Sequence, residues 1–244
     1  MHEGHAGMVA ELARQGRLTP PDGGSNDSYS GSNRPYYLVG VPERRAMVRQ
    51  WIAGHKTAPV AEVLTLAESL FDGESHEEKT LGAILIAAHP KARAAVTPAD
   101  LDRWLGQLHG WAEIDSLCQN IFGPDQMLHG WPAWKAMLQA LSRDANINKR
   151  RAALVLLNAP NHYSDDPRFR DLAFEVIERL KGERDILITK AISWLLRSMI
   201  TRHRAAVIAY LEAAAPTLPA IAVRETWVKL ATGTKSGRSR RPLT

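Results

Sequence analysis

The residues best suited to chemistry in this sequence are an aromatic side chain and a carboxylate four positions apart, Trp111 and Asp115. In a helix this spacing places the two side chains one turn apart on the same face. An indole face attracts a cation through its quadrupole, and a carboxylate attracts it directly when water is partly excluded. The pair is therefore suited to a cationic reacting centre.

Two later segments carry side chains that could line the same space. A basic cluster at 149–151 opens an apolar stretch, and Trp194 and Arg197 lie three residues apart in a second one. Each residue also has a simpler interpretation, because a Trp in an all-α protein more often packs between helices and a basic residue at a helix end is often solvated. The recurrence of Trp, Asp, Arg, Trp and Arg on successive elements favours a site.

The elements that must position these residues are helices. Apolar residues recur at helical spacing from residue 42 onward, and no period-two run indicates a sheet. The predicted helices span 8–17, 42–55, 59–71, 76–89, 98–108, 111–122, 131–141, 148–158, 167–180, 186–200, 203–214 and 220–231. The sequence therefore predicts an all-α fold.

These helices also repeat as pairs. The matching positions are Phe71, Leu141 and Leu180, each eleven residues before a small residue, Gly82, Ala152 or Ala191. A helical-hairpin period of about 40 residues is typical of HEAT or armadillo arrays, which stack into a curved solenoid with a concave face. The second helix of each pair normally lines that face, so Arg151 and Lys190 are expected to point toward whatever the curve encloses.

In order and spacing, these motifs resemble the AlkD-type DNA alkylation repair glycosylases, which are built from HEAT-like repeats. The resemblance runs from about residue 29 to about residue 237. The motifs that carry it are Gly40-Val41-Pro42-Glu43-Arg44-Arg45, the Trp111/Asp115 pair, Arg151-Ala152-Ala153 and Lys190-Ala191-Ile192-Ser193-Trp194-Leu195-Leu196-Arg197. It implies an all-α solenoid of HEAT-like repeats with a concave DNA-binding face.

The resemblance also implies roles for individual residues. Asp115 matches the family's catalytic aspartate, and Trp111 and Trp194 match the two tryptophans that cradle the damaged nucleotide. The implied DNA-binding residues are Arg151, Arg197 and Tyr29, with Lys190 and Arg150 as contributors to a positive groove. A guanidinium suits phosphate because its planar fork matches the phosphate oxygens.

Together these roles imply a DNA glycosylase of base excision repair. It would hydrolyse the N-glycosidic bond of positively charged alkylpurines, such as 3-methyladenine and 7-methylguanine, in duplex DNA. Such a base is already a good leaving group, and a fixed carboxylate near C1′ would stabilise the oxocarbenium-like sugar without a general acid. The alternatives are a HEAT-repeat DNA-binding or scaffold protein without catalysis, and a scaffold whose curved face binds an acidic peptide.

Composition sets further bounds on partners and compartment. The 244 residues carry a formal charge of +5, which mildly favours an anionic partner. The single cysteine, Cys118, excludes an internal disulfide and a multi-cysteine zinc site and is expected to be a small buried hydrophobe. The nine histidines show no ligand spacing, so no metal site and no cofactor are expected.

The chain is expected to divide into three parts. Residues 1–35 form an N-terminal helix and flexible loop, residues 36–232 the repeat domain, and residues 233–244 a basic, disordered tail. No secretory signal or membrane-spanning run is present, so a cytoplasmic monomer that binds DNA is the expectation.

Overall fold

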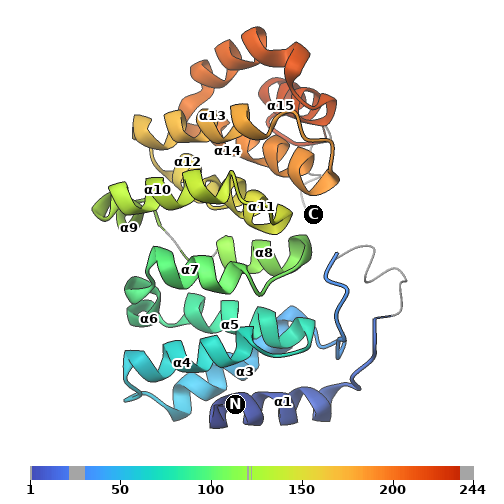
Figure 1. Ribbon diagram of the computed structural model, residues 1–244, viewed down its shortest axis with the longest axis vertical. Helices are drawn as coiled ribbons and strands as arrows, with labels where there is room; N and C mark the ends of the chain where they lie inside the picture. The colour runs from blue at the N-terminus through green and yellow to red at the C-terminus, as the bar shows by residue number, and fades with distance from the viewer. Residues whose placement is uncertain (1, 22–30, 120, 122, 237–244) are drawn as a thin grey trace, which may run out of the picture. The chain divides into compact units, whose positions relative to one another are not determined.

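All the regular secondary structure in the part of the chain that the computed structural model describes, which is residues 2–21, 31–119, 121 and 123–236, is helical (Figure 1). Among these residues the extended pairing is limited to one isolated bridge, between Thr19 and Tyr36. The predicted all-α class is confirmed. The chain forms two compact units, Met1–Phe122 and Gly123–Thr244.

The helices of the N-terminal unit surround one buried helix, α5. They are α1 (Glu3–Gln15), α3 (Val41–Gly54), α4 (Val60–Phe71), α5 (His76–Ala88), α6 (Pro90–Ala95), α7 (Pro98–Leu105) and α8 (Gly110–Cys118). Helix α5 packs against α3, α4, α6 and α8, whereas α1 lies on α3 and α4. Because these helices cover it on several sides, most of α5 is buried, and this includes the charged residues of its first turn.

In the C-terminal unit the central element is α14. The elements are α9 (Pro124–His129), α10 (Trp131–Leu141), α11 (Ile147–Val155), α12 (Asn158–Tyr163), α13 (Pro167–Leu180), α14 (Ile186–Ala214), the short 3-10 helix η1 (Ala215–Thr217) and α15 (Ala220–Thr232). Helix α14 packs against α11, α12, α13 and α15. Among the described residues, no helix is both long enough and apolar enough to cross a membrane.

The predicted pairing of helices is confirmed at its boundaries. Helices α4, α10 and α13 end at Phe71, Leu141 and Leu180, the residues that mark the repeat, and α5, α11 and α14 begin within six residues of those ends. A packing reason accounts for one small residue of the pattern, because a Cβ on Gly82 would lie 3.0 Å from the Phe71 ring. The chain is therefore an all-α helical-repeat protein.

Polar caps begin the second helix of each of these pairs. The side chains of Ser75, Asn146 and Asp185 accept hydrogen bonds from backbone amides in the first turns of α5, α11 and α14. Each cap satisfies an amide that has no partner within the helix. At Ser75 the Glu78 side chain also accepts from the cap residue's amide, which completes a capping box.

The structure differs from the predicted helices at several places. Helix α1 spans Glu3–Gln15 instead of 8–17, and α7 and α11 end at Leu105 and Val155, three residues before their predicted ends. The predicted helices 186–200 and 203–214 are one helix, α14, with non-helical backbone angles at His203. The six-residue helices α6, α9 and α12 were not predicted, because each is too short to show a helical period. Helix α8 ends at Cys118, before the predicted end at residue 122.

Candidate active site

Trp111 and Asp115 lie on α8, as their spacing predicts. The chain enters this helix through Gly110, whose φ of +71° is favourable only for glycine. Ile114 and Leu117 are fully buried on the same helix and fix its orientation. Asp115 is itself only 5% exposed, and Trp111 is half-buried beside it.

Both side chains line one pocket of the N-terminal unit, with a volume of about 570 Å³. Its other walls come from the segment 32–45 and from α5. The lining residues that matter for the argument are Arg34, Leu38, Arg45, Trp111, Asp115 and Ser116. The pocket thus combines the buried carboxylate of Asp115, an indole and three arginines, Arg34, Arg44 and Arg45, within the size range of small-molecule sites.

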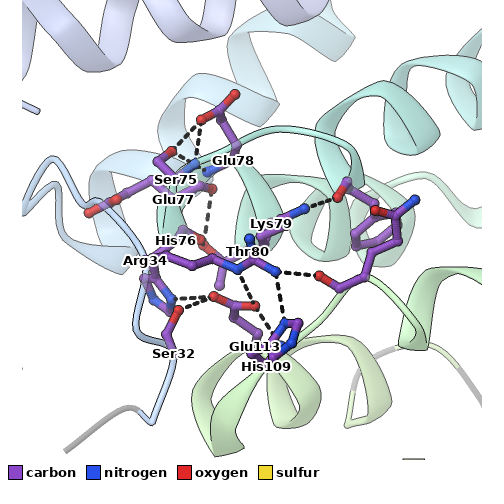
Figure 2. A network of polar contacts seen from close by, with 12 residues as sticks. Ser32, Arg34, Ser75, His76, Glu77, Glu78, Lys79, Thr80, His109 and Glu113 are labelled. Carbon is purple, nitrogen blue, oxygen red and sulfur yellow. Dashed lines mark hydrogen bonds and ion pairs between the residues drawn. The ribbon is translucent and has the colours of Figure 1, made fainter. Parts of the chain in front are cut away.

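A second carboxylate near the pocket, Glu113, is occupied by structural contacts (Figure 2). It is 1% exposed and accepts from the backbone amide of His109 at 2.9 Å and from Nδ1 of His76 at 3.3 Å. Ser32 Oγ also donates to this carboxylate, and so does Arg34 Nε, at 3.4 Å. Glu113 therefore attaches the segment after residue 31 to α8 and α5.

The ionisation of Glu113 follows from these contacts. Burial raises the pKa of its carboxyl, but the hydrogen bonds from His76, Ser32 and the His109 amide outweigh burial and hold the pKa below the ordinary 4.5. Glu113 is consequently charged at neutral pH and saturated with donors. It cannot take the place of Asp115 as the carboxylate that faces a reacting centre.

Glu77 on α5 is occupied in a similar way. It is 3% exposed, and its carboxylate accepts from the backbone amides of Tyr37 at 2.9 Å and Val39 at 3.3 Å. Next to it, buried Arg44 donates to Thr80 Oγ1, and burial lowers the pKa of the Arg44 guanidinium. These contacts hold the segment 37–39 on α5, so Glu77 has a structural role.

Three of the predicted residues of the C-terminal unit lie on two neighbouring helices, α11 and α14. Arg151 is 5% exposed and donates from Nη1 to the carbonyl oxygen of Leu187 at 2.5 Å, which attaches α11 to the first turn of α14. Trp194 is half-buried on α14, one turn before Arg197. The three residues therefore lie on two helices that pack against each other.

Arg197 is oriented by α15. Its Nε lies 3.3 Å from Ser193 Oγ and 3.5 Å from Glu225 Oε2, and Ser193 Oγ donates to the same Glu225 oxygen at 2.6 Å. Burial lowers the pKa of Arg197, and the charge of Glu225 opposes that shift. The guanidinium is thus fixed in one direction by a partner on a neighbouring helix.

The remaining predicted DNA contacts differ in their surroundings. Arg150 makes a two-point ion pair with Glu183, at 2.7 and 3.1 Å, and donates to the carbonyl oxygens of residues 144 and 145, so it has a structural role. Lys190 is exposed. Tyr29 lies outside the described residues.

Sequence reasoning missed Glu113 and Glu77, which hold the pocket wall. A signal existed for Glu113, because an acid in the first turn of a helix that starts with glycine often bonds to the amides at the helix end. Across the described residues, no group of three or more His, Cys, Asp or Glu side chains could hold a metal ion.

The two units carry opposite formal charges. Residues 1–122 contain 11 Lys and Arg against 15 Asp and Glu, which gives −4, whereas residues 123–244 contain 20 against 11, which gives +9. The basic character of the chain therefore resides in its C-terminal half, which carries Arg151, Lys190 and Arg197.

Fold and site together define a class: an all-α helical-repeat protein whose pocket presents a buried carboxylate and an indole, a combination suited to a cationic centre. A family model described as DNA alkylation repair enzyme matches residues 12–230 of this sequence. The chain belongs to that family, which confirms the resemblance to AlkD-type proteins.

Structural comparison agrees with this assignment at the level of the fold. A solved structure described as a predicted DNA alkylation repair enzyme from Enterococcus faecalis superposes with a TM-score of 0.62. The two sequences are 18% identical, and the match covers 94% of this chain and 95% of the other. No curated protein matches the sequence.

Proposed function

We propose that this protein is a DNA glycosylase that removes positively charged alkylpurines, such as 3-methyladenine and 7-methylguanine, from duplex DNA. The observation that carries the proposal is Asp115, a buried carboxylate beside Trp111 in the wall of a pocket, in a member of the DNA alkylation repair family. Membership of the family makes DNA the expected partner and a repair reaction the expected activity.

The reaction follows from the charge of the substrate. The bond between C1′ and the purine nitrogen breaks, its electron pair leaves with the base, and the base departs neutral. The sugar becomes oxocarbenium-like, and the Asp115 carboxylate stabilises its positive charge. Water then adds to C1′ and releases a proton, which leaves an abasic site.

The surroundings of Asp115 suit this role. Trp111 adds an indole face that attracts the cation and displaces water, which strengthens the attraction of the carboxylate. Because Glu77 and Glu113 are both saturated with donors, neither is a general acid, so the substrates are bases that already leave readily. On the DNA side, Arg151, Arg197 and Lys190 are the proposed phosphate contacts.

The first prediction concerns Asp115→Asn, which keeps the shape of the side chain and removes its charge. We expect the release of 7-methylguanine from a duplex to slow by about 10²–10³-fold, the usual cost of losing one preorganised stabilising group. The measurement is single-turnover base release. The matched control is Asp125→Asn at an exposed position on α9, which should keep the wild-type rate.

Two outcomes would count against the proposal. Equal rates for the wild type and Asp115→Asn would remove Asp115 from the mechanism. If the wild type binds duplex DNA but releases no base from 7-methylguanine or 3-methyladenine substrates, the chain is instead a DNA-binding helical-repeat protein without this chemistry.

A further inference from the structure

Leu38 has a backbone conformation that is unusual for its residue type. Its φ is +59°, in the left-handed region that favours glycine and, among other residues, asparagine. Its side chain is also 68% exposed, the highest exposure among the large apolar residues of the described chain that are exposed. A strained backbone and an exposed apolar side chain at one position require an explanation.

The conformation is imposed by backbone contacts on both sides of Leu38. The flanking amides of Tyr37 and Val39 both donate to the Glu77 carboxylate, and a left-handed residue between two amides allows them to point at one anion. Just before this, the Pro35 carbonyl oxygen accepts from the His76 amide at 2.9 Å. The backbone path therefore depends on α5, and the Leu38 side chain contributes little to it.

The side chain lies at the candidate site. Leu38 lines the same pocket as Trp111 and Asp115, together with Val41, which is 44% exposed. Arg34 and Arg45 line it as well, so the apolar pair stands among cations that suit a phosphate-bearing ligand. Residues held in a strained conformation by their surroundings are concentrated at functional sites.

We propose that Leu38 is a substrate-contacting residue, whose apolar side chain packs against the sugar of the damaged nucleotide at the Asp115 pocket and keeps water from it. The inference rests on the proposed function. Water exclusion strengthens the attraction between a carboxylate and a developing cation, so Leu38 raises both affinity for the lesion and the rate of base loss.

The position offers a sharp test, because asparagine has nearly the size of leucine and tolerates the left-handed region. Leu38→Asn should leave the thermal midpoint of the N-terminal unit unchanged or raised, since strain is relieved and the backbone contacts with Glu77 remain. A variant with native stability and impaired recognition separates a substrate contact from a role in folding.

Two readouts are measured on Leu38→Asn. The first is kcat/KM for release of 7-methylguanine, and the second is the affinity for a duplex with a cationic pyrrolidine in place of one sugar and base. We expect both to fall on the order of 10-fold, because burial of most of a leucine side chain is lost. Affinity for the undamaged duplex should stay within about twofold, since no charge changes.

Two further variants serve as controls. Leu38→Met keeps an apolar side chain and should retain activity within about threefold. Leu18→Asn replaces another exposed leucine of the same unit that does not line the pocket, and it should behave as the wild type.

The outcomes separate the two proposals. If the wild type releases no base, the glycosylase proposal fails, and Leu38 is judged by affinity for the pyrrolidine duplex alone. Weaker binding by Leu38→Asn then supports the contact, and equal binding overturns it. If the wild type is active, the contact is overturned by native kcat/KM in Leu38→Asn or by an equal loss of affinity for damaged and undamaged duplex.

Discussion

At the scale of single residues, the pocket separates carboxylates that hold structure from the one proposed for chemistry. Glu113 and Glu77, at 1% and 3% exposed, are more buried than Asp115 at 5%, and both accept several donors from segments that wall the pocket. Burial alone therefore does not identify a catalytic acid. Asp115 is distinguished by its position, one helical turn from Trp111 in the wall of the pocket.

The pair Trp111 and Asp115 could be predicted because its geometry is local to one helix. The contacts of Glu113 could not, because Ser32 and Arg34 are 81 and 79 residues away in sequence and meet it only in the folded unit. Leu38 was missed for a related reason, since its left-handed conformation is imposed by Glu77 from another element. Whether the predicted DNA contacts bind phosphate stays a prediction.

Lys79 provides a prediction about pH. This α5 residue is 3% exposed and donates from Nζ to the Phe71 carbonyl oxygen at the end of α4. Burial, followed by the charge of Arg34, lowers its pKa from 10.5 to about 8. Between these values the folded chain has lost the proton and the unfolded chain retains it, so the free energy of unfolding increases with pH in this window.

We expect Lys79→Met to abolish that increase, which amounts to about 3 kcal/mol at most between pH 8 and 10.5. The measurement is urea unfolding of the wild type and the variant at several pH values. The difference between their free energies of unfolding at each pH cancels the contributions of the other titrating groups. Lys91→Met, at an exposed position on α6, is the control and should keep the wild-type profile. An unchanged slope in Lys79→Met would show that Lys79 titrates normally.

At the scale of elements, helix α5 is the one on which the pocket depends. It contributes Glu77, which holds the segment with Leu38, and His76, which bonds to Glu113. It also packs against α8, which carries Asp115. A substitution that destabilises the first turn of α5 is therefore expected to displace the residues that line the candidate site.

The capping box of α5 allows the contribution of this first turn to stability to be measured. Ser75 is fully buried, accepts from the Glu78 amide at 3.2 Å and donates to the Glu78 carboxylate at 2.5 Å. We expect Ser75→Ala to lower the free energy of unfolding by about 2 kcal/mol, since a cap is lost and a buried carboxylate loses a donor. Urea unfolding at pH 7 measures the change.

The matched control is Thr97→Ala, because Thr97 caps α7 with the same type of box at an exposed position. Water replaces its hydrogen bonds, so a loss of about 1 kcal/mol or less is expected. If Thr97→Ala were to lower the free energy of unfolding as much as Ser75→Ala, burial would not explain the contribution of Ser75 to stability.

Most helices could be predicted from sequence. Each long helix buries one apolar stripe, and the stripe appears in the sequence as apolar residues that recur every three or four positions. Helices α10 and α13 begin and end where the pattern places them. The short helices α6 and α12 have fewer than two turns, so no stripe forms. The joining of two predicted helices through His203 depends on tertiary packing around that buried residue.

At the scale of the whole molecule, the charge difference between the two units suggests that they contribute to different parts of the proposed function, DNA binding and lesion recognition. The C-terminal unit carries +9 and the N-terminal unit −4, although the latter holds the pocket with Asp115. Attraction to the phosphate backbone is long-ranged and does not depend on sequence, whereas recognition of a lesion is local. We therefore expect the attraction to phosphate to come from residues 123–244 and the recognition of the lesion to come from the pocket.

The dependence of duplex binding on salt tests this division. We expect Lys190→Ala to reduce the slope of log K against log salt concentration by about 0.9, the contribution of one phosphate contact. Lys91→Ala removes the same charge from an exposed position in the acidic unit and should leave the slope unchanged. Fluorescence anisotropy with an undamaged duplex at several salt concentrations measures both.

A Lys190→Ala slope equal to that of the wild type would show that Lys190 makes no phosphate contact. Equal reductions in both variants would instead point to a general effect of net charge.

The opposite charges of the two units also decide which assay would detect a variant with a disrupted pocket. We expect retention on an immobilised polyanion such as heparin to depend on the C-terminal unit, so that a chain with a disrupted pocket elutes with the intact one. Under the proposed function, such a chain would keep its affinity for DNA but would no longer remove damaged bases. Occupancy and repair must therefore be scored separately.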